Sequence, residues 1–228
     1  LKLFALPGSG DSYRGESYAA EPSPPNAINE KAIVDAQAVG EAVRRAVKRA
    51  GARSRECAVA VSGDAAITKV IQMPRNLRAS ELESQVEMQA DQYIPFPMEE
   101  VSYDFEVVGP SEKDPEMLDV LLVATRSENV EQRQAAVQAA GLTARIVDVE
   151  AFALENACRL LTHQMPDGGM ERSIAVVDFG ASSTTFSVLR DTKVAYTRDF
   201  SFGGQQLTEE IMRTYGLSME EAGRAKKE

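Results

Sequence analysis

One stretch, Ile174–Val188, constrains the fold of this chain more than any other, and it reads Ile-Ala-Val-Val-Asp-Phe-Gly-Ala-Ser-Ser-Thr-Thr-Phe-Ser-Val. Its apolar, β-branched start is typical of a buried strand, and a second β-rich run follows a small polar tip. Gly180 tolerates positive φ and lets a ligand approach the backbone. The small residues after it can line an anion-binding concavity with N–H groups and hydroxyls: Ala181, Ser182, Ser183 and Thr184. Asp178, at the strand end, is placed to hold a metal-bound water near phosphates.

The stretch therefore predicts a phosphate-binding hairpin, but a second interpretation stays open at this point. Asp-x-Gly and Ser/Thr clusters also mark ordinary turns that bind nothing. The surrounding chain has to decide between the two.

Length and charge narrow the class of protein. The chain has 228 residues, of which 43% are hydrophobic, enough for a core and for more than one domain or subdomain. Its formal net charge of −10 argues against a nucleic-acid surface, because phosphate neutralisation needs clustered Lys and Arg.

The cysteines and the lengths of the apolar runs indicate the cellular compartment of the protein. Cys57 and Cys158 lie outside any ligand-spaced cluster and are predicted to be small buried residues in a reducing environment. No apolar run reaches the length of about 18 residues that a membrane span needs, and no signal peptide is visible. We expect a cytoplasmic protein with no direct membrane span. Because Leu1 falls inside a strand pattern and Glu228 inside a helical one, we also expect the sequence to be part of a longer chain.

The middle of the chain follows a strand–helix–strand–strand–helix–strand order. A preceding amphipathic helix is predicted from Asp35 to Ala50, with Gly51 as its stop. Ser80 is expected to open one helix through a capping box with Glu83, and Ser127 to cap the next. The predicted elements of this order are strands at 67–73, 101–108, 118–124 and 143–149, with helices at 80–94 and 127–140; a further strand is predicted before them, at 57–62. Such an α+β unit is of the kind that is inserted into larger folds.

Three features then occur in an informative order. An acidic strand end, Asp148-Val-Glu150, leads into an Ala-rich helix; the Asp178–Thr184 loop follows; and Gly203-Gly204 opens a later helix. This order resembles the second phosphate region of the actin-like ATPase superfamily, which includes actin, sugar kinases, DnaK-type chaperones and FtsA. The resemblance implies that Glu150 lies near Mg²⁺ and the attacking water, that Asp178 faces the metal, and that 180–184 surround the β- and γ-phosphates. It also implies that Gly203 and Gly204 face the nucleotide at a helix N-terminus, a position suited to an anion.

A finer resemblance, spread over essentially the whole chain, is to the type IV pilus assembly PilM family. The matching segments are Ser9–Tyr13, Pro24–Ala27, Ala58–Gly63, Ile67–Lys69, Asp91-Gln-Tyr-Ile-Pro-Phe96, Asp104–Glu106, Gly109–Pro115, Val147–Ala151 and Tyr215–Ser218. The resemblance implies a cytoplasmic actin-like (ribonuclease H-like) α/β fold with an inserted small α+β subdomain, and binding of ATP with Mg²⁺. It further implies docking of the N-terminal peptide of PilN, which links the inner-membrane pilus complex to the motor ATPase in twitching motility.

That resemblance predicts a domain plan, and the chain departs from the family pattern at a few positions. Residues 1–64, completed by 146–170, would form the first actin-like subdomain, 65–145 the FtsA-like insertion, and 171–228 the start of the second subdomain. Lys226 matches a nucleoside contact of the family, whereas Gly223 stands where an acidic ribose contact is expected, so weakened nucleotide binding is predicted. The family's first phosphate loop and its adenine-side Gly motif are absent from the sequence, and this part of the protein alone is expected to bind no nucleotide.

The partner peptide is expected between the large and inserted subdomains, near Val59, Val61, Tyr93, Ile94 and Phe96, since a peptide can add to a sheet edge and fill a groove. An ATP-binding scaffold with slow hydrolysis at most, and not an enzyme, is the favoured function. A catalytic actin-like ATPase or kinase, and the cytoplasmic domain of a type II secretion L-type protein, stay as alternatives. A kinase needs a base at an acceptor hydroxyl, and the sequence identifies none beyond the shared acids.

Overall fold

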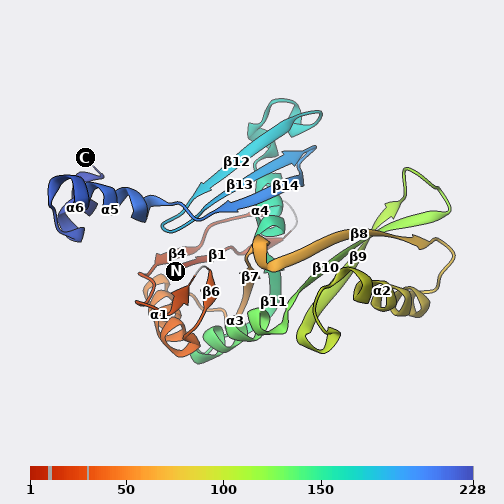
Figure 1. Ribbon diagram of the computed structural model, residues 1–228, viewed down its shortest axis with the longest axis horizontal. Helices are drawn as coiled ribbons and strands as arrows, with labels where there is room; N and C mark the ends of the chain where they lie inside the picture. The colour runs from red at the N-terminus through yellow and green to blue at the C-terminus, as the bar shows by residue number, and fades with distance from the viewer. Residues whose placement is uncertain (10–11, 30, 228) are drawn as a thin grey trace. The chain divides into compact units, whose positions relative to one another are not determined.

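The computed structural model describes residues 1–9, 12–29 and 31–227, and it divides into two compact units, Leu1–Val149 and Glu150–Glu228 (Figure 1). Gly10 and Asp11, which belong to a predicted turn and to one matching segment, lie outside the described residues. Each unit is described by itself.

Unit 1 begins with an antiparallel hairpin covered by a helix. Strands β1 (Lys2–Ala5) and β4 (Ser17–Ala20) pair, and the short pairs β2 (Gly8–Ser9) with β3 (Ser12–Tyr13) and β5 (Ile28–Asn29) with β6 (Ala32–Ile33) lie in the connections. Helix α1 (Ala36–Ala50) starts where the Asp35 carboxylate accepts a hydrogen bond from the Ala38 N–H at 2.9 Å. It stops at Gly51, whose φ of 66° lies in the left-handed region. Both ends of this helix were predicted from the sequence.

The basic C-terminal end of α1 is tied to neighbouring elements by its Arg side chains. Arg49 and Arg45 approach the buried carboxylate of Glu21, at the end of β4, with N–O distances of 2.9 and 3.5 Å. Arg44 donates to the carbonyl of Ala139. These contacts orient the helix on the hairpin.

A parallel strand pair forms the second part of unit 1. Strand β7 (Glu56–Val61) pairs with β11 (Thr143–Val149), and helix α3 (Ser127–Ala139) precedes β11. Val137, Ala140 and Leu142 pack with side chains of α1 and β7. Parallel strands need a crossover connection, and here it contains 81 positions, from Ser62 to Leu142.

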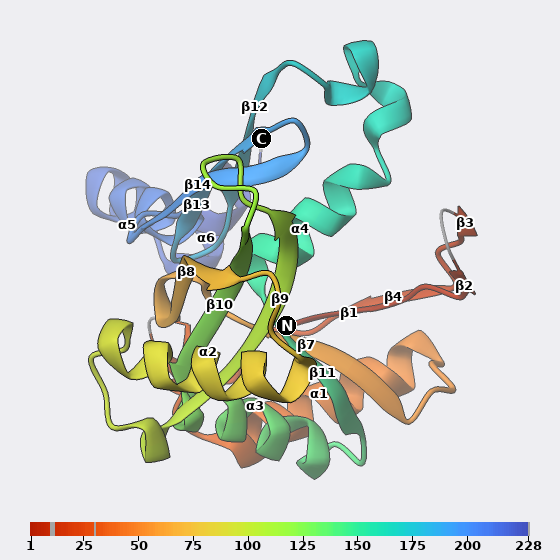
Figure 2. The ribbon, with the colours of Figure 1, turned by 90° about the vertical axis from the view of Figure 1, so that its right-hand side faces the viewer.

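That crossover carries a small sheet with its own helix. Strands β8 (Ala66–Pro74), β10 (Met117–Arg126) and β9 (Val101–Pro110) form an antiparallel sheet in the order β8-β10-β9. Helix α2 (Ala79–Tyr93) lies across one face of it (Figure 2) and encloses a core that includes Met73, Val86 and Leu122. The 3-10 turns η1 (Gly63–Ala65) and η2 (Met98–Glu100) flank the sheet strands. The predicted strand–helix–strand–strand–helix–strand order is confirmed.

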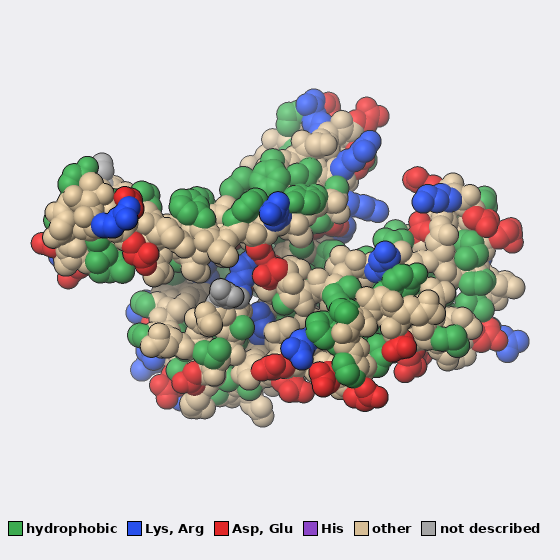
Figure 3. Space-filling model, in the orientation of Figure 1, with side chains coloured by type: hydrophobic (Ala, Val, Ile, Leu, Met, Phe, Trp, Pro, Cys, Tyr) green, Lys and Arg blue, Asp and Glu red, His purple; other side chains and the backbone are tan. Residues whose placement is uncertain are grey.

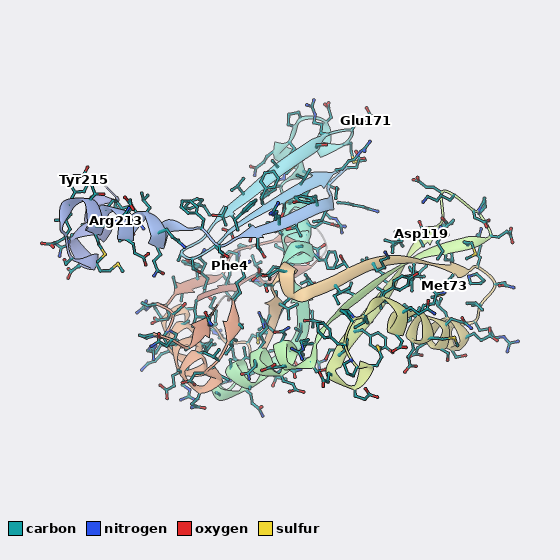
Figure 4. The ribbon with its side chains drawn as sticks, in the orientation of Figure 1. Phe4, Met73, Asp119, Glu171, Arg213 and Tyr215 are labelled. Atoms are coloured by element: carbon teal, nitrogen blue, oxygen red, sulfur yellow. The ribbon has the colours of Figure 1, made fainter. Side chains whose placement is uncertain are left out.

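Alternation along the strands separates two faces of this sheet. Met73 and its neighbours at every second position point to α2, whereas Asp119 points to the opposite, helix-free face (Figure 4). The cross-strand rows of this open face are Thr68–Val123–Asp104, Val70–Leu121–Glu106 and Gln72–Asp119–Gly109. The open face is therefore a mixture of aliphatic and acidic side chains.

Unit 2 is an antiparallel sheet followed by two helices. Strands β12 (Ser173–Phe179), β13 (Thr184–Arg190) and β14 (Lys193–Phe200) form a meander, and α5 (Gly204–Tyr215) and α6 (Met219–Ala225) follow. Helix α4 (Glu150–Arg159) and the 3-10 turns η3 (Thr162–Gln164) and η4 (Pro166–Gly169) precede it. A carboxylate oxygen of Glu155 accepts from the Val194 N–H at 2.7 Å and ties α4 to β14. Figure 3 shows hydrophobic side chains over these strands, where Val177, Phe179 and Phe200 are exposed.

Several predicted details differ from the structure. Helix α3, which the predicted domain plan assigned to the insertion, packs with α1 and β7. Helix α2 is capped at Arg78, because the Glu81 carboxylate accepts from the Arg78 N–H at 2.8 Å. The Ser127 hydroxyl bonds Ser102 at 3.1 Å instead of capping α3. In the last two cases the helix begins before the residue predicted to cap it or at that residue, so the predicted cap lies within the helix.

A glycine controls the closest approach of α1 and α3. A Cβ added at Gly40 would lie 2.5 Å from the Ala139 Cβ and 2.6 Å from the Ala136 carbonyl oxygen. We expect Gly40→Ala to lower the free energy of unfolding by about 1–3 kcal/mol, because overpacking exceeds the gain in helix propensity. Calorimetric unfolding measures this change.

Gly223 supplies the matched control, because it is also helical but no atom lies within 4 Å of its added Cβ. Gly223→Ala should stabilise its helix by up to about 1 kcal/mol. Equal stabilisation by the two substitutions would contradict the proposed helix contact.

Candidate functional site

The tip between β12 and β13 is a tight turn. The Gly180 N–H donates to the Ser183 carbonyl at 2.9 Å, and a Cβ on Gly180 would lie 2.8 Å from that oxygen. Ala181 and Ser182 at the tip are exposed. Among the described residues, no hydrogen bond uses the hydroxyl of Ser182 or of Ser183. These hydroxyls are the groups of the loop that can contact a ligand.

The start of α5 packs directly on this turn. The N–H groups of Gly204 and Gln205 donate to the carbonyls of Gly180 and Ala181 at 2.9 and 2.7 Å. A Cβ on Gly203 would lie 2.6 Å from the Ala181 oxygen, closer than such contacts allow. Gly203 is thus required by the close approach of two backbone segments.

The buried Thr184 hydroxyl strengthens the same junction, since it donates to the Phe202 carbonyl at 2.7 Å. Thr184 was predicted as a phosphate contact. Its hydroxyl proton is instead committed to holding the chain that enters α5.

The N–H groups at the start of α5 already have partners within the protein. The Gly203 N–H donates to the Gln206 side chain at 2.9 Å, and the next two N–H groups are used by the turn. The amides of Gly203 and Gly204 were predicted to face a nucleotide, yet protein oxygens already satisfy them. The two glycines shape the site but do not offer free donors to an anion.

The structure brings Lys226 to this same helix start. Its ammonium group donates to the Gly204 carbonyl at 2.9 Å and to the Thr208 hydroxyl at 2.8 Å. A cation near the positive end of a helix dipole is electrostatically unfavourable unless an anion is also close. Lys226 and Gly204, distant in the sequence and both predicted as nucleotide contacts, are therefore neighbours.

Asp178 lies in a polar row across the sheet. Strand register places it opposite Thr185, which lies opposite Asp199, and the Thr185 hydroxyl donates to the Asp199 carboxylate. Sequence reasoning missed Asp199, although strand alternation in 193–200 could have placed it on this face. Hard carboxylate oxygens fit a Mg²⁺ ion held through water. The described part of the chain contains no group of three or more His, Cys, Asp or Glu side chains arranged to hold a metal.

The predicted catalytic residue, Glu150, is the first residue of α4 and is exposed. An acid in a first helical turn interacts favourably with the helix dipole, so a structural reason for it exists. Its proximity to a reacting water stays a prediction.

A second candidate site lies wholly within unit 1. A groove of about 200 Å³ runs between the carboxyl ends of β7 and β11 and the open face of the inserted sheet. Its aliphatic lining comes mainly from Val61, Val123, Val130, Val147 and Val149. Ligands of α/β folds favour the carboxyl ends of parallel strands.

The charged side chains that line this groove are both acidic. Asp104 comes from β9 and Asp148 from β11, and each accepts a hydrogen bond from the next residue's N–H, at 2.8 and 2.7 Å. Among the described residues, neither forms an ion pair. The groove thus combines an apolar wall with two carboxylates.

The predicted peptide-contact residues are not all gathered there. Val61 lines the groove, whereas Val59 lines a separate cavity of about 620 Å³ between β1, β7, α1 and α3. Ile94 is buried in the core under α2, and Phe96 packs against that core with the Arg126 guanidinium over its ring. Tyr93 lies on the α2 side beneath Lys69. These three residues lie on the α2 side of the sheet, away from the groove, and their contact with a peptide stays a prediction.

Neither thiol is arranged for chemistry. Burial raises the pKa of both Cys57 and Cys158, which disfavours the reactive thiolate.

Within residues 1–9, 12–29 and 31–227, no helix is both long and apolar enough to cross a bilayer.

The chain is similar to a known protein family and to several solved structures. A family model described as type IV pilus assembly protein PilM matches residues 1–228. The solved PilM-PilN type IV pilus biogenesis complex contains a chain that is 29% identical, with a TM-score of 0.79 over 99% of this chain. This chain spans 66% of the length of that solved chain.

More distant structures include an ethanolamine utilization protein, EutJ of Carboxydothermus hydrogenoformans, at 17% identity and a TM-score of 0.47, covering 89% of this chain and 50% of that one. MreB 5 of Spiroplasma citri, bound to AMPPNP, matches at 11% identity and a TM-score of 0.43, covering 88% and 43% of the two chains.

The turn-to-helix junction generates a prediction. Gly203→Ala should separate α5 from the turn, because its Cβ would meet backbone atoms of Ala181 and Gly180 within 2.8 Å. We expect unit 2 to lose about 1–3 kcal/mol of unfolding free energy and the amide NMR shifts of 180–183 to move.

Gly204→Ala is the matched control. The nearest atom to its added Cβ is the flexible Lys226 ammonium, at 3.4 Å, so this variant should unfold much as the parent does. If the amide NMR shifts of 180–183 are unchanged in Gly203→Ala, the contact between the turn and the start of α5 is contradicted.

Proposed function

This chain belongs to the type IV pilus assembly protein PilM family and has its actin-like α/β fold, and we propose that it acts in pilus assembly as a cytoplasmic scaffold that docks the N-terminal cytoplasmic peptide of a PilN protein. In that role it lies peripheral to the inner membrane and connects the membrane complex to the pilus motor ATPase. It is a binding protein rather than an enzyme.

The observation that carries this proposal is the groove of unit 1. An extended peptide can place alternate side chains against the aliphatic wall formed by Val61, Val123 and Val147. The free edge of β9, which carries Asp104, also offers main-chain groups to such a peptide. Apolar contacts supply affinity, while main-chain pairing fixes direction and register.

The second element of the proposal is ATP with Mg²⁺, bound on unit 2. Lys226 holds a positive charge beside the start of α5, while Ser182 and Ser183 present hydroxyls at the neighbouring turn. Asp178 and Asp199 supply carboxylate oxygens for hydrated Mg²⁺. Bound ATP would order these segments, and slow hydrolysis at most is expected because binding and not turnover performs the role.

Titration calorimetry tests peptide docking. The protein, in the longest form that its gene encodes, is titrated with the N-terminal cytoplasmic peptide of its cognate PilN, with and without Mg·ATP. We expect saturable one-to-one binding, and a difference between the two titrations would measure coupling of the sites.

Absence of binding in both states, in protein shown to be folded, would overturn the scaffold proposal. Steady-state ATP turnover at rates typical of kinases, about 1–100 s⁻¹, would favour a catalytic function instead.

Gly223 provides a test of the nucleotide site. Because no atom lies within 4 Å of an added Cβ there, a larger side chain can be accommodated. Gly223→Glu, which restores the acid expected at a ribose, should tighten ATP binding about tenfold through a charged hydrogen bond.

Gly223→Ala, which gives the same helix propensity gain without the carboxylate, should leave ATP affinity unchanged. Lys226→Met should weaken ATP binding. Equal ATP affinity in the parent and in both the Glu and Met variants would show that the nucleotide does not reach this helix start.

A further inference from the structure

We propose that the groove of unit 1 selects a partner segment by charge as well as by hydrophobicity, and that Asp104 and Asp148 are the residues that recognise a Lys or Arg side chain of the docked peptide. The inference rests on the proposed function, and it adds the chemistry that distinguishes a cognate segment from any other apolar peptide.

The first observation is the distribution of charge around the groove. Of the described residues that line it, only Asp104 and Asp148 are charged. The adjoining open face adds Glu106 and Asp119, while its described strand positions include no Lys or Arg. The basic residues of the insertion's strands, Lys69 and Arg126, lie over aromatic rings on the α2 side. Acidic and basic groups are thus separated onto opposite faces of one sheet.

The second observation is the state of the two carboxylates. Each uses Oδ1 to accept a bond from the following amide, at Phe105 and at Val149. Among the described residues, no Lys or Arg forms an ion pair with either. These local bonds orient the carboxylates, and Oδ2 is the atom that can accept from a partner's cation. The oriented carboxylate loses little freedom on binding.

The third observation is the apolar wall next to these acids. Val61 and Val149 are buried, and Val123 and Val147 are partly buried beside the carboxylates. A docked aliphatic side chain would displace water from this wall and lower the local dielectric, which strengthens an adjacent charge pair. An alternating peptide, with aliphatic residues flanking one cation, matches both features along a single extended strand.

The experiment compares two peptides and three variants. The peptides are the cognate partner's N-terminal cytoplasmic segment and the same segment with each Lys and Arg replaced by Gln. The variants are Asp104→Asn, Asp148→Asn and, as a control on the same open face but outside the groove lining, Asp119→Asn. Asn keeps an Oδ1 acceptor, so the bond to the next amide is retained while the charge is removed.

We expect each groove variant to weaken binding of the charged peptide about threefold to tenfold, and Asp119→Asn to change it less than twofold. Binding of the charged peptide should also weaken with added salt, more so in the parent than in the groove variants. The neutral peptide should bind weakly and equally to all four proteins.

The outcomes separate the two proposals. If the charged peptide does not bind the parent, the proposed function itself fails. If it binds but ignores salt and both groove variants, or if the cognate segment contains no Lys or Arg, docking stands and the charge selection is wrong. If the groove instead pairs two copies of this chain, light scattering will show self-association that Asp104→Asn alters and peptide does not, which also overturns the inference.

Discussion

The parallel pairing of β7 with β11 is the constraint on which unit 1 depends. Two parallel strands cannot be joined by a tight turn, so the chain has to cross over between Val61 and Thr143. In this protein the crossover contains a complete three-stranded sheet with its own helical cover. The insertion leaves and returns at one side of the strand pair, so a groove forms where the strand ends meet the open face of the inserted sheet. The position of the candidate peptide site thus follows from the topology and not from particular side chains.

In unit 2 the controlling factor is the use of backbone donors. A glycine-rich turn beside a helix N-terminus suggests an anion site, because both offer N–H groups. Here the carbonyls of Gly180 and Ala181 accept the helix N–H groups of Gly204 and Gln205, which ties the helix start to the turn. Any phosphate recognition here would use the exposed turn and the side chains of Lys226, Ser182 and Ser183 rather than the N–H groups at the start of α5. Gly180 and Gly203 are required sterically in either case, so glycine alone did not distinguish a ligand site from a packing contact.

The sequence was sufficient to predict the structure where interactions between residues close in the chain decide it. The ends of α1 followed from Asp35 and Gly51, because caps act over a single turn. It was insufficient where partners are distant in the chain. The role of α3 beside α1 depends on the close contact at Gly40, and neither sequence segment reveals it alone. Of the residues predicted to contact a peptide, Val61 lines the groove whereas Ile94 and Phe96 lie on the α2 side, since periodicity predicts that a residue is buried but not which face of a sheet its helix covers.

The acidity of the whole chain and the acidity of the groove have different consequences. A net charge of −10 attracts any basic partner at long range, and this effect raises association rates for cognate and non-cognate peptides alike. Asp104 and Asp148 differ from the other acids because aliphatic side chains adjoin them, so water is displaced when a peptide docks. A cation placed there gains more from the charge pair than one at the rim, whereas an apolar residue in its place would leave two partly desolvated carboxylates without a partner. Selection should therefore be expressed in the dissociation rate of the docked peptide rather than in the rate at which it arrives.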